Sequence, residues 1–81
     1  MSLTDTFVEA ELAAGKSHKQ LMDDLSKATG YTVGHSTLSR WRHRHRNPEP
    51  APRQYMLRKA IPHVIKGITP KQVEALVEAL S

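Results

Sequence analysis

The sequence contains no cysteine, only four glycines and only four aromatic side chains. The absence of cysteine excludes disulfides, thiolate catalysis and zinc sites with cysteine ligands. No stretch approaches the roughly 20 apolar residues that span a membrane. The first residues also lack the basic-then-apolar order of a signal peptide. We therefore expect a cytoplasmic protein with no membrane partner.

The chain of 81 residues has room for one small domain. A domain of this size buries only about 60% of the surface of its unfolded chain, so its core must be thin. The hydrophobic fraction of 38% is nevertheless too high for a disordered tail. Without disulfides, the fold must depend on helix packing, with self-association as a possible addition.

Positive charge is concentrated in the middle of the chain. Residues 1–34 carry three lysines and five acids, a net charge of −2, and residues 67–81 have a net charge of −1. Residues 35–66 carry six arginines and two lysines but only one acid, a net charge of +7. This distribution favours a surface that meets a polyanion over a merely solvated basic face.

Helix signals recur along the chain, whereas the alternating pattern of strands is absent. The first helix is expected over 3–14 and the second from Ser17 to Gly30. The third is expected over 37–43, with a continuation toward Arg46. The fourth should start at about 52, and the last should follow Thr69. The proline-rich segment 47–52 is expected to be non-helical, and Pro62 to kink or break the fourth helix. The predicted fold is all-α, a compact bundle of five to six short helices containing a helix-turn-helix.

The caps and the apolar spacing support these helices. Ser17 with Gln20, and Thr69 with Gln72, have the spacing of capping boxes. Apolar residues at helical spacing predict buried stripes, and the members are Leu3, Phe7, Val8, Ala10, Leu12 and Ala14 in the first helix, Leu21, Met22, Leu25 and Ala28 in the second, and Met56, Leu57, Ala60 and Ile61 in the fourth.

Residues 16–48 carry the main functional signal, since two short helices joined by a glycine-containing turn, the second one basic, describe a helix-turn-helix. A helical wheel of the third helix separates two faces. The face expected in the core holds Leu38, Trp41 and His45. The opposite face holds Ser36, Ser39, Arg40, His43 and Arg44, with Thr37 and Arg46 at its edges.

This segment resembles a known family, the lambda-repressor-like (Cro/C1-type, XRE) helix-turn-helix domain of phage and bacterial regulators. The matching residues are Lys16–Leu25, Ser36-Thr37-Leu38-Ser39-Arg40-Trp41, and Pro48 seven residues after the tryptophan. The resemblance covers about residues 3–66 and implies a compact bundle whose third helix enters the major groove. Members of the family usually bind inverted repeats as dimers, and the small ones are mostly repressors.

The chain departs from the family in two places. Its connection between the second and third helices is longer than the usual tight turn. Arg42 and Arg44 stand where the family often has an acidic residue and a helix-ending glycine.

The predicted function is therefore a sequence-specific double-stranded DNA-binding transcriptional regulator, a small phage- or plasmid-type repressor that acts as a homodimer at the nucleoid. Base readout is expected mainly from the start of the third helix, and phosphate contacts from the later arginines and the start of the second helix. The predicted DNA-binding residues are Ser17, His18, Lys19, His35, Ser36, Thr37, Ser39, Arg40, Arg42, His43, Arg44 and Arg46.

Other chemistry finds little support in the sequence. His43 and His45 are two apart, a spacing that places them on different sides of a helix, so no metal site is expected. His35 beside Ser36 lacks a third orienting group, and no glycine-rich phosphate loop is present. We expect no enzyme activity, no cofactor and no small-molecule substrate.

The C-terminal segment 67–81 allows two interpretations beside the 1–66 DNA-binding unit. Its apolar stripe, Val73, Leu76, Val77 and Leu80, either completes the core or forms a homodimer seam, and we favour the seam. Two other functions stay open as alternatives. One is a protein–protein adaptor or antirepressor with the same fold, whose last helix docks on a partner. The other is non-specific nucleic-acid binding.

Overall fold

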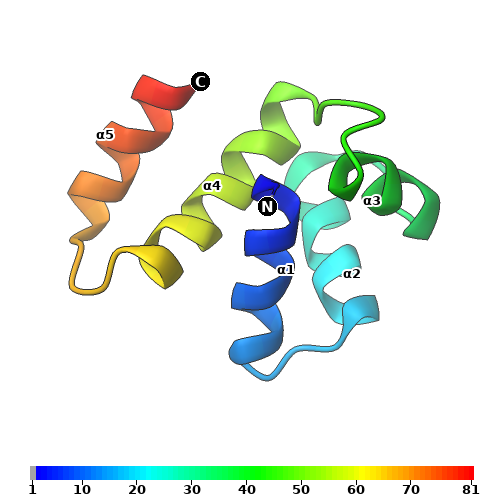
Figure 1. Ribbon diagram of the computed structural model, residues 1–81, viewed down its shortest axis with the longest axis horizontal. Coiled ribbons are helices and arrows are strands. Elements are labelled where there is room, and N and C mark those ends of the chain that lie inside the picture. The colour runs from blue at the N-terminus through cyan, green and yellow to red at the C-terminus, as the bar shows by residue number, and fades with distance from the viewer. Residues whose placement is uncertain (1) are drawn as a thin grey trace.

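Residues 2–81 form five α-helices and no strand in the computed structural model of the chain (Figure 1). The helices are α1 (Leu3–Ala13), α2 (His18–Thr29), α3 (His35–Arg42), α4 (Pro50–Val64) and α5 (Pro70–Leu80). The predicted all-α bundle is confirmed, at the lower of the two expected helix numbers. Residue 1 of the predicted 1–66 unit lies outside the described residues. Within residues 2–81, no helix combines the length and apolar character needed to cross a membrane.

Side-chain caps begin three of the helices. The Ser17 hydroxyl accepts a hydrogen bond from the Gln20 amide (3.2 Å), which is one of the two bonds of the capping box predicted for α2. At α5, Thr69 and Gln72 each accept a bond from the other's backbone amide, which confirms that capping box. A capping box that the sequence analysis overlooked starts α1, between Ser2 and Asp5.

Helix α3 differs from expectation at both ends. It begins at His35 with Gly34 as its N-cap, two residues earlier than the predicted start at 37. It ends at Arg42 and does not continue toward Arg46. The His45 amide donates to the Arg40 carbonyl (2.9 Å) and the Arg44 amide to that of Trp41 (3.3 Å), so the end is a Schellman motif.

The residue at the left-handed position of this motif is Arg44, with φ of 59°. The family that the sequence resembles often has glycine there, and the backbone adopts the turn even though a side chain is present. Because the helix has already ended, His45 is exposed and does not join the core as the helical wheel predicted.

Helix α4 includes residues 50–52, which were predicted to be non-helical, and it is not broken at Pro62. Pro50 and Pro52 lie in its first turn, where no intrahelical acceptor exists for their missing N–H groups. The first helical hydrogen bond runs from Arg53 to the carbonyl of Glu49 (3.0 Å). Pro62 lies inside the helix, which continues to Val64.

The larger core cluster joins α1, α2, α3 and the first half of α4. Its buried members are Phe7, Val8, Leu21, Met22, Leu25, Val33, Leu38, Trp41 and Met56. The buried face of α1 contains Thr4 and Glu11 beside Phe7 and Val8, whereas the predicted Leu12 is 41% exposed. The stripe of α1 is thus rotated from the expected one, and Ala28 of α2 is also exposed.

A smaller cluster joins α4 to α5, and its buried members are Leu57, Ile61, Val73 and Val77. Leu3 packs against both clusters. Two of the four predicted seam residues, Val73 and Val77, are therefore used within the chain, which favours the core-completing interpretation for them. Leu76 is half-buried and Leu80 is 51% exposed, so a seam on α5 would have to use this remaining side.

Candidate nucleic-acid interface

Helix α3 has one buried face and one exposed polar face. Leu38 and Trp41 are each only 3% exposed and hold the helix against the larger core cluster. Ser36, Ser39 and Arg40 lie on the outside, as the helical wheel predicted. The helix has no acidic residue in its first turn and no side-chain cap, so the first amides are not covered by a capping hydroxyl or carboxylate.

The connection between α2 and α3 is ordered around one apolar residue. Val33 is buried in the larger cluster, and its amide donates to the Ser26 hydroxyl (2.9 Å). Gly30 ends α2 in the left-handed conformation, with φ of 75°. The five residues 30–34 are longer than a tight turn, and α3 packs mainly on α1. The approach of α3 is therefore set by its packing on α1 and by the buried Val33 of the connection.

The surface around α3 is basic over a long stretch of chain. No acid occurs between Asp24 and Glu49, whereas this stretch contains Lys27, four arginines and three histidines. Figure 1 shows α3 and the first turn of α2 on the right side of the molecule, with α5 at the opposite side. The basic stretch around α3 thus lies on the side of the molecule opposite α5.

The first turn of α2 contributes three of the predicted residues, Ser17, His18 and Lys19, and all three are exposed. The preceding Lys16 has a different role. Its ammonium group lies 2.7 Å from Asp24 and 3.5 Å from Glu11, which ties the α1–α2 turn to both helices. The hydrogen bond between Lys16 and Asp24 raises the pKa of Lys16 and lowers that of Asp24.

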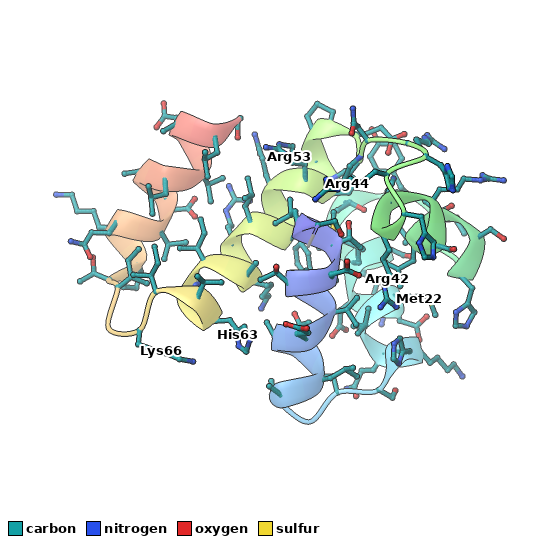
Figure 2. The ribbon with its side chains drawn as sticks, viewed as in Figure 1. Met22, Arg42, Arg44, Arg53, His63 and Lys66 are labelled. Carbon is teal, nitrogen blue, oxygen red and sulfur yellow. The ribbon has the colours of Figure 1, made fainter. Side chains whose placement is uncertain are left out.

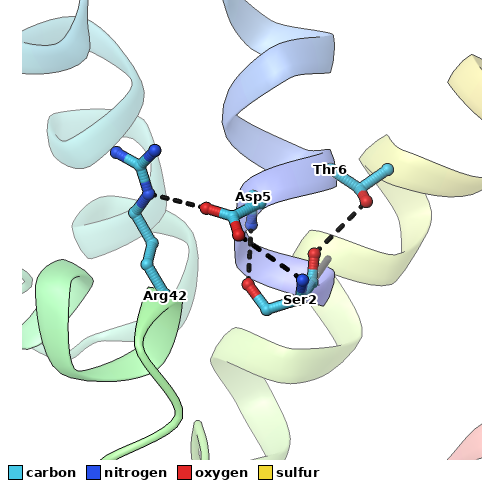
Figure 3. A network of polar contacts seen from close by, with 4 residues as sticks. All are labelled: Ser2, Asp5, Thr6 and Arg42. Carbon is cyan, nitrogen blue, oxygen red and sulfur yellow. Dashed lines mark hydrogen bonds and ion pairs between the residues drawn. The ribbon is translucent and has the colours of Figure 1, made fainter.

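Arg42 is engaged inside the molecule. Its Nε atom donates to Oδ1 of Asp5 at 2.7 Å, which joins the end of α3 to the first turn of α1 (Figure 3). Asp5 also takes part in the capping box with Ser2, whose carbonyl accepts from the Thr6 hydroxyl (3.2 Å). The Arg42 hydrogen bond is the main reason why the pKa of Asp5 is lowered.

The four arginines of 40–46 therefore differ in their surroundings. Arg42 is paired with Asp5, and Arg46 with Glu49. The pKa of Glu49 is lowered, first by its own backbone amide and then by Arg46. Within residues 2–81, the side chain of Arg40 has neither an acid within 4 Å nor a hydrogen bond. Arg40 is therefore available to an external ligand at no cost in internal contacts.

The remaining predicted residues lie around the same helix. His35, His43, Arg44 and Arg46 are exposed and Thr37 is half-buried. The rings of His43 and His45 are 6.3 Å apart. Over residues 2–81, no three histidine, aspartate or glutamate side chains are grouped so as to hold a metal ion.

The sequence analysis missed the partner of Arg42. The signal that points to it is the charge reversal at Arg42, where the resembled family often has an acid, together with an acid at the third position of a Ser-capped first helix. Searches among protein-family models, curated proteins and solved structures found no match to this chain.

Proposed function

We propose that the chain is a sequence-specific double-stranded DNA-binding regulator that inserts α3 into the major groove. The observation that carries this proposal is the exposed face of α3, where Ser36, Ser39 and the unpaired Arg40 project from a stretch of chain, 25–48, that contains no acid. An adaptor surface would have no need of a long basic stretch around this helix. Non-specific binding would need the charge alone and not the hydroxyl groups.

The chemistry of the face suits base edges. A guanidinium fork pairs bidentately with O6 and N7 of guanine, and a serine hydroxyl can donate to or accept from several bases. Burial of Leu38 and Trp41 fixes the rotation of α3, so that these groups project outward together. Lys19 and the exposed amides at the start of α2 are suited to phosphates, which set register.

We also propose that the protein acts as a homodimeric repressor on an inverted repeat, as the family resemblance implies. Two copies of α3 must then lie about one helical turn apart, roughly 34–36 Å. Since Val73 and Val77 pack against α4, the better candidates for a seam are the exposed Val64, Ile65 and Leu80 and the half-buried Leu76.

The test is selection of binding sites from a random duplex library, followed by titration of the enriched and a scrambled duplex at several salt concentrations. Arg40→Ala should cost about 1–3 kcal/mol on the enriched site and much less on the scrambled one. Arg58→Ala is the matched control, since it removes the same charge from an α4 arginine that is paired with Glu74. Equal loss on both duplexes from Arg40→Ala would refute the readout role.

The adaptor remains the second candidate because of the exposed apolar residues at the α4–α5 turn. Ile65 is 46% exposed and lines a shallow apolar pocket with Ile68 and Leu76. Leu80→Asp and Ile65→Asp test it without disturbing the buried Val77. Loss of regulation in these variants, with full activity of Arg40→Ala, would favour the adaptor over the DNA reader.

A further inference from the structure

A second basic feature lies outside the exposed face of α3. A pocket of about 210 Å³ is formed between the start of α1, the loop after α3 and the start of α4. Three arginines line it, namely Arg44, Arg46 and Arg53, and no acidic residue does. Figure 2 shows Arg44 and Arg53 near each other at this junction. The volume corresponds to several water molecules, enough for a tetrahedral oxyanion.

The arginines come from two different elements and are held by neighbours. Arg46 pairs with Glu49, which stands outside the lining. Nη2 of Arg53 donates to the carbonyl of Leu80 (3.2 Å), so its guanidinium is anchored from the C-terminal end of α5. An anchored guanidinium loses less conformational freedom when it binds an anion, and its planar fork matches a phosphate.

Trp41 gives an independent sign of a missing acceptor. Trp41 is among the residues that line the pocket, and its Nε1 atom is buried without a hydrogen-bond partner. A buried donor that is left unsatisfied is destabilising, and such groups often mark a site for a water, an ion or a ligand. Leu3 and Thr4, the first residues of α1, also line the pocket, and amides at these positions have no acceptor inside their own helix.

We propose that this pocket binds a phosphate group. The three guanidinium groups supply positive charge, and the Trp41 indole and the α1 amides supply neutral donors. The phosphate is either one on a nucleic-acid backbone or free inorganic phosphate. The pocket does not contain the proposed base-reading residues Ser36, Ser39 and Arg40, although Arg44 and Arg46 are also among the residues predicted to contact DNA phosphates.

The experiment uses the single tryptophan of the full chain as a reporter. Inorganic phosphate is titrated at constant ionic strength while the ¹H–¹⁵N signal of the Trp41 indole and its fluorescence are followed. We expect a saturable shift whose midpoint rises about tenfold in Arg46→Gln and in Arg53→Gln, the effect of losing one charge-assisted contact. Glu49→Gln should lower the midpoint because it releases Arg46.

Arg58→Gln is the matched control, with the same loss of charge on α4 outside the pocket, and its midpoint should stay within about twofold. Arg46 lies in an exposed loop, so Arg46→Gln keeps the test valid if Arg53→Gln does not fold. A shift that chloride reproduces, or one that all variants share, would overturn the proposal.

A second arm identifies the source of the phosphate. A scrambled duplex that shifts the same indole signal, and that free phosphate displaces, assigns the pocket to the DNA backbone. A duplex that leaves the signal unchanged assigns it to free phosphate. Saturable phosphate binding without an enriched duplex would support the phosphate site and refute the proposed DNA readout. An enriched duplex without saturable phosphate binding would refute only the phosphate site.

Discussion

The two core clusters of this small protein differ in size and in what they hold. The larger one gathers nine buried residues from α1, α2, α3, α4 and the 30–34 connection, with Phe7, Leu21, Leu25 and Met56 fully enclosed. The smaller one has four buried residues and joins only α4 and α5, with Leu3 and two other partly buried side chains at its margin. The helix with the candidate reading face is fixed by the larger cluster.

This difference indicates an unequal distribution of stability. A region with many mutually packed apolar side chains opens only with the whole domain, whereas a helix held by a few contacts can open locally. We therefore expect α5 to open at a lower free energy than α3. The C-terminal helix is consequently the part of the fold best able to rearrange in favour of a partner.

The largest expected effect compares one residue from each cluster. Leu25→Ala removes a fully enclosed side chain and should lower the free energy of unfolding by about 2–5 kcal/mol. Val77→Ala removes two carbons from the smaller cluster and should cost about 1.5–2.5 kcal/mol. Urea unfolding measures both losses, and hydrogen exchange should show α5 amides opening first in Val77→Ala.

Leu12→Ala is the control for leucine loss at an exposed site, and it should change stability by less than about 0.5 kcal/mol. If the amides of α5 are protected as strongly as those of α2 in the unaltered chain, the two clusters form one cooperative unit and the comparison fails.

Most helices of the fold could be predicted from local sequence, because caps and apolar spacing are properties of neighbouring residues. Ser17, Gly30 and Thr69 mark true helix ends, and Met56, Leu57, Ala60 and Ile61 are all buried as expected. The stripe of α1 was misjudged because Thr4 and Glu11 are polar yet buried. Their burial depends on how α1 packs on other helices, which periodicity in α1 alone does not reveal.

The candidate site was predictable in its residues but not in their pairing. The exposure of Ser36, Ser39 and Arg40 follows from the helical period of α3. The pairing of Arg42 with Asp5 spans 37 positions and depends on the tertiary placement of α1 beside α3. The same holds for Val73 and Val77, since a stripe at helical spacing looks alike whether it meets α4 or a second copy.

The next effect compares two helix ends near the larger cluster. The ends of α1 and α3 both have Schellman hydrogen bonds, but Gly15 (φ 90°) occupies the left-handed position in one and Arg44 (φ 59°) in the other. Gly15→Ala should lower the unfolding free energy by about 1 kcal/mol through the backbone alone, because a Cβ there meets nothing within 4 Å.

Arg44→Gly should raise the unfolding free energy by about 0.5–1 kcal/mol, since the relief of the left-handed strain exceeds the added chain entropy. Thermal unfolding measures both changes, at roughly 4–8 °C per kcal/mol for a domain of this size. Arg44→Gly should at the same time weaken binding to enriched and scrambled duplexes alike, because it removes a charge. A loss of stability in Arg44→Gly would show that side-chain contacts of Arg44 outweigh its backbone strain.

The smallest effect compares the ion pair that ties α3 to α1 with the one that ties α5 to α4. Arg42 meets Asp5, and Arg58 meets Glu74 with Nε at 2.8 and 3.1 Å from its two carboxylate oxygens. Asp5→Asn should cost about 0.2–1 kcal/mol at pH 7, since both partners are partly in solvent. Glu74→Gln should cost less, because the Glu74 side chain is 57% exposed against 28% for Asp5.

The pH dependence separates the charge from the shape of Asp5. The pKa of Asp5 is lowered in the folded chain from its ordinary value of 3.8. The stabilisation that ionised Asp5 gives to the folded chain is therefore complete above this ordinary value, and it is lost as the pH falls through the folded pKa. The difference in unfolding free energy between the unaltered chain and Asp5→Asn should therefore be constant from pH 5 to 7 and shrink below about pH 4. A difference that persists unchanged in acid would mean that Asp5 acts through the capping of α1 and not through its charge on Arg42.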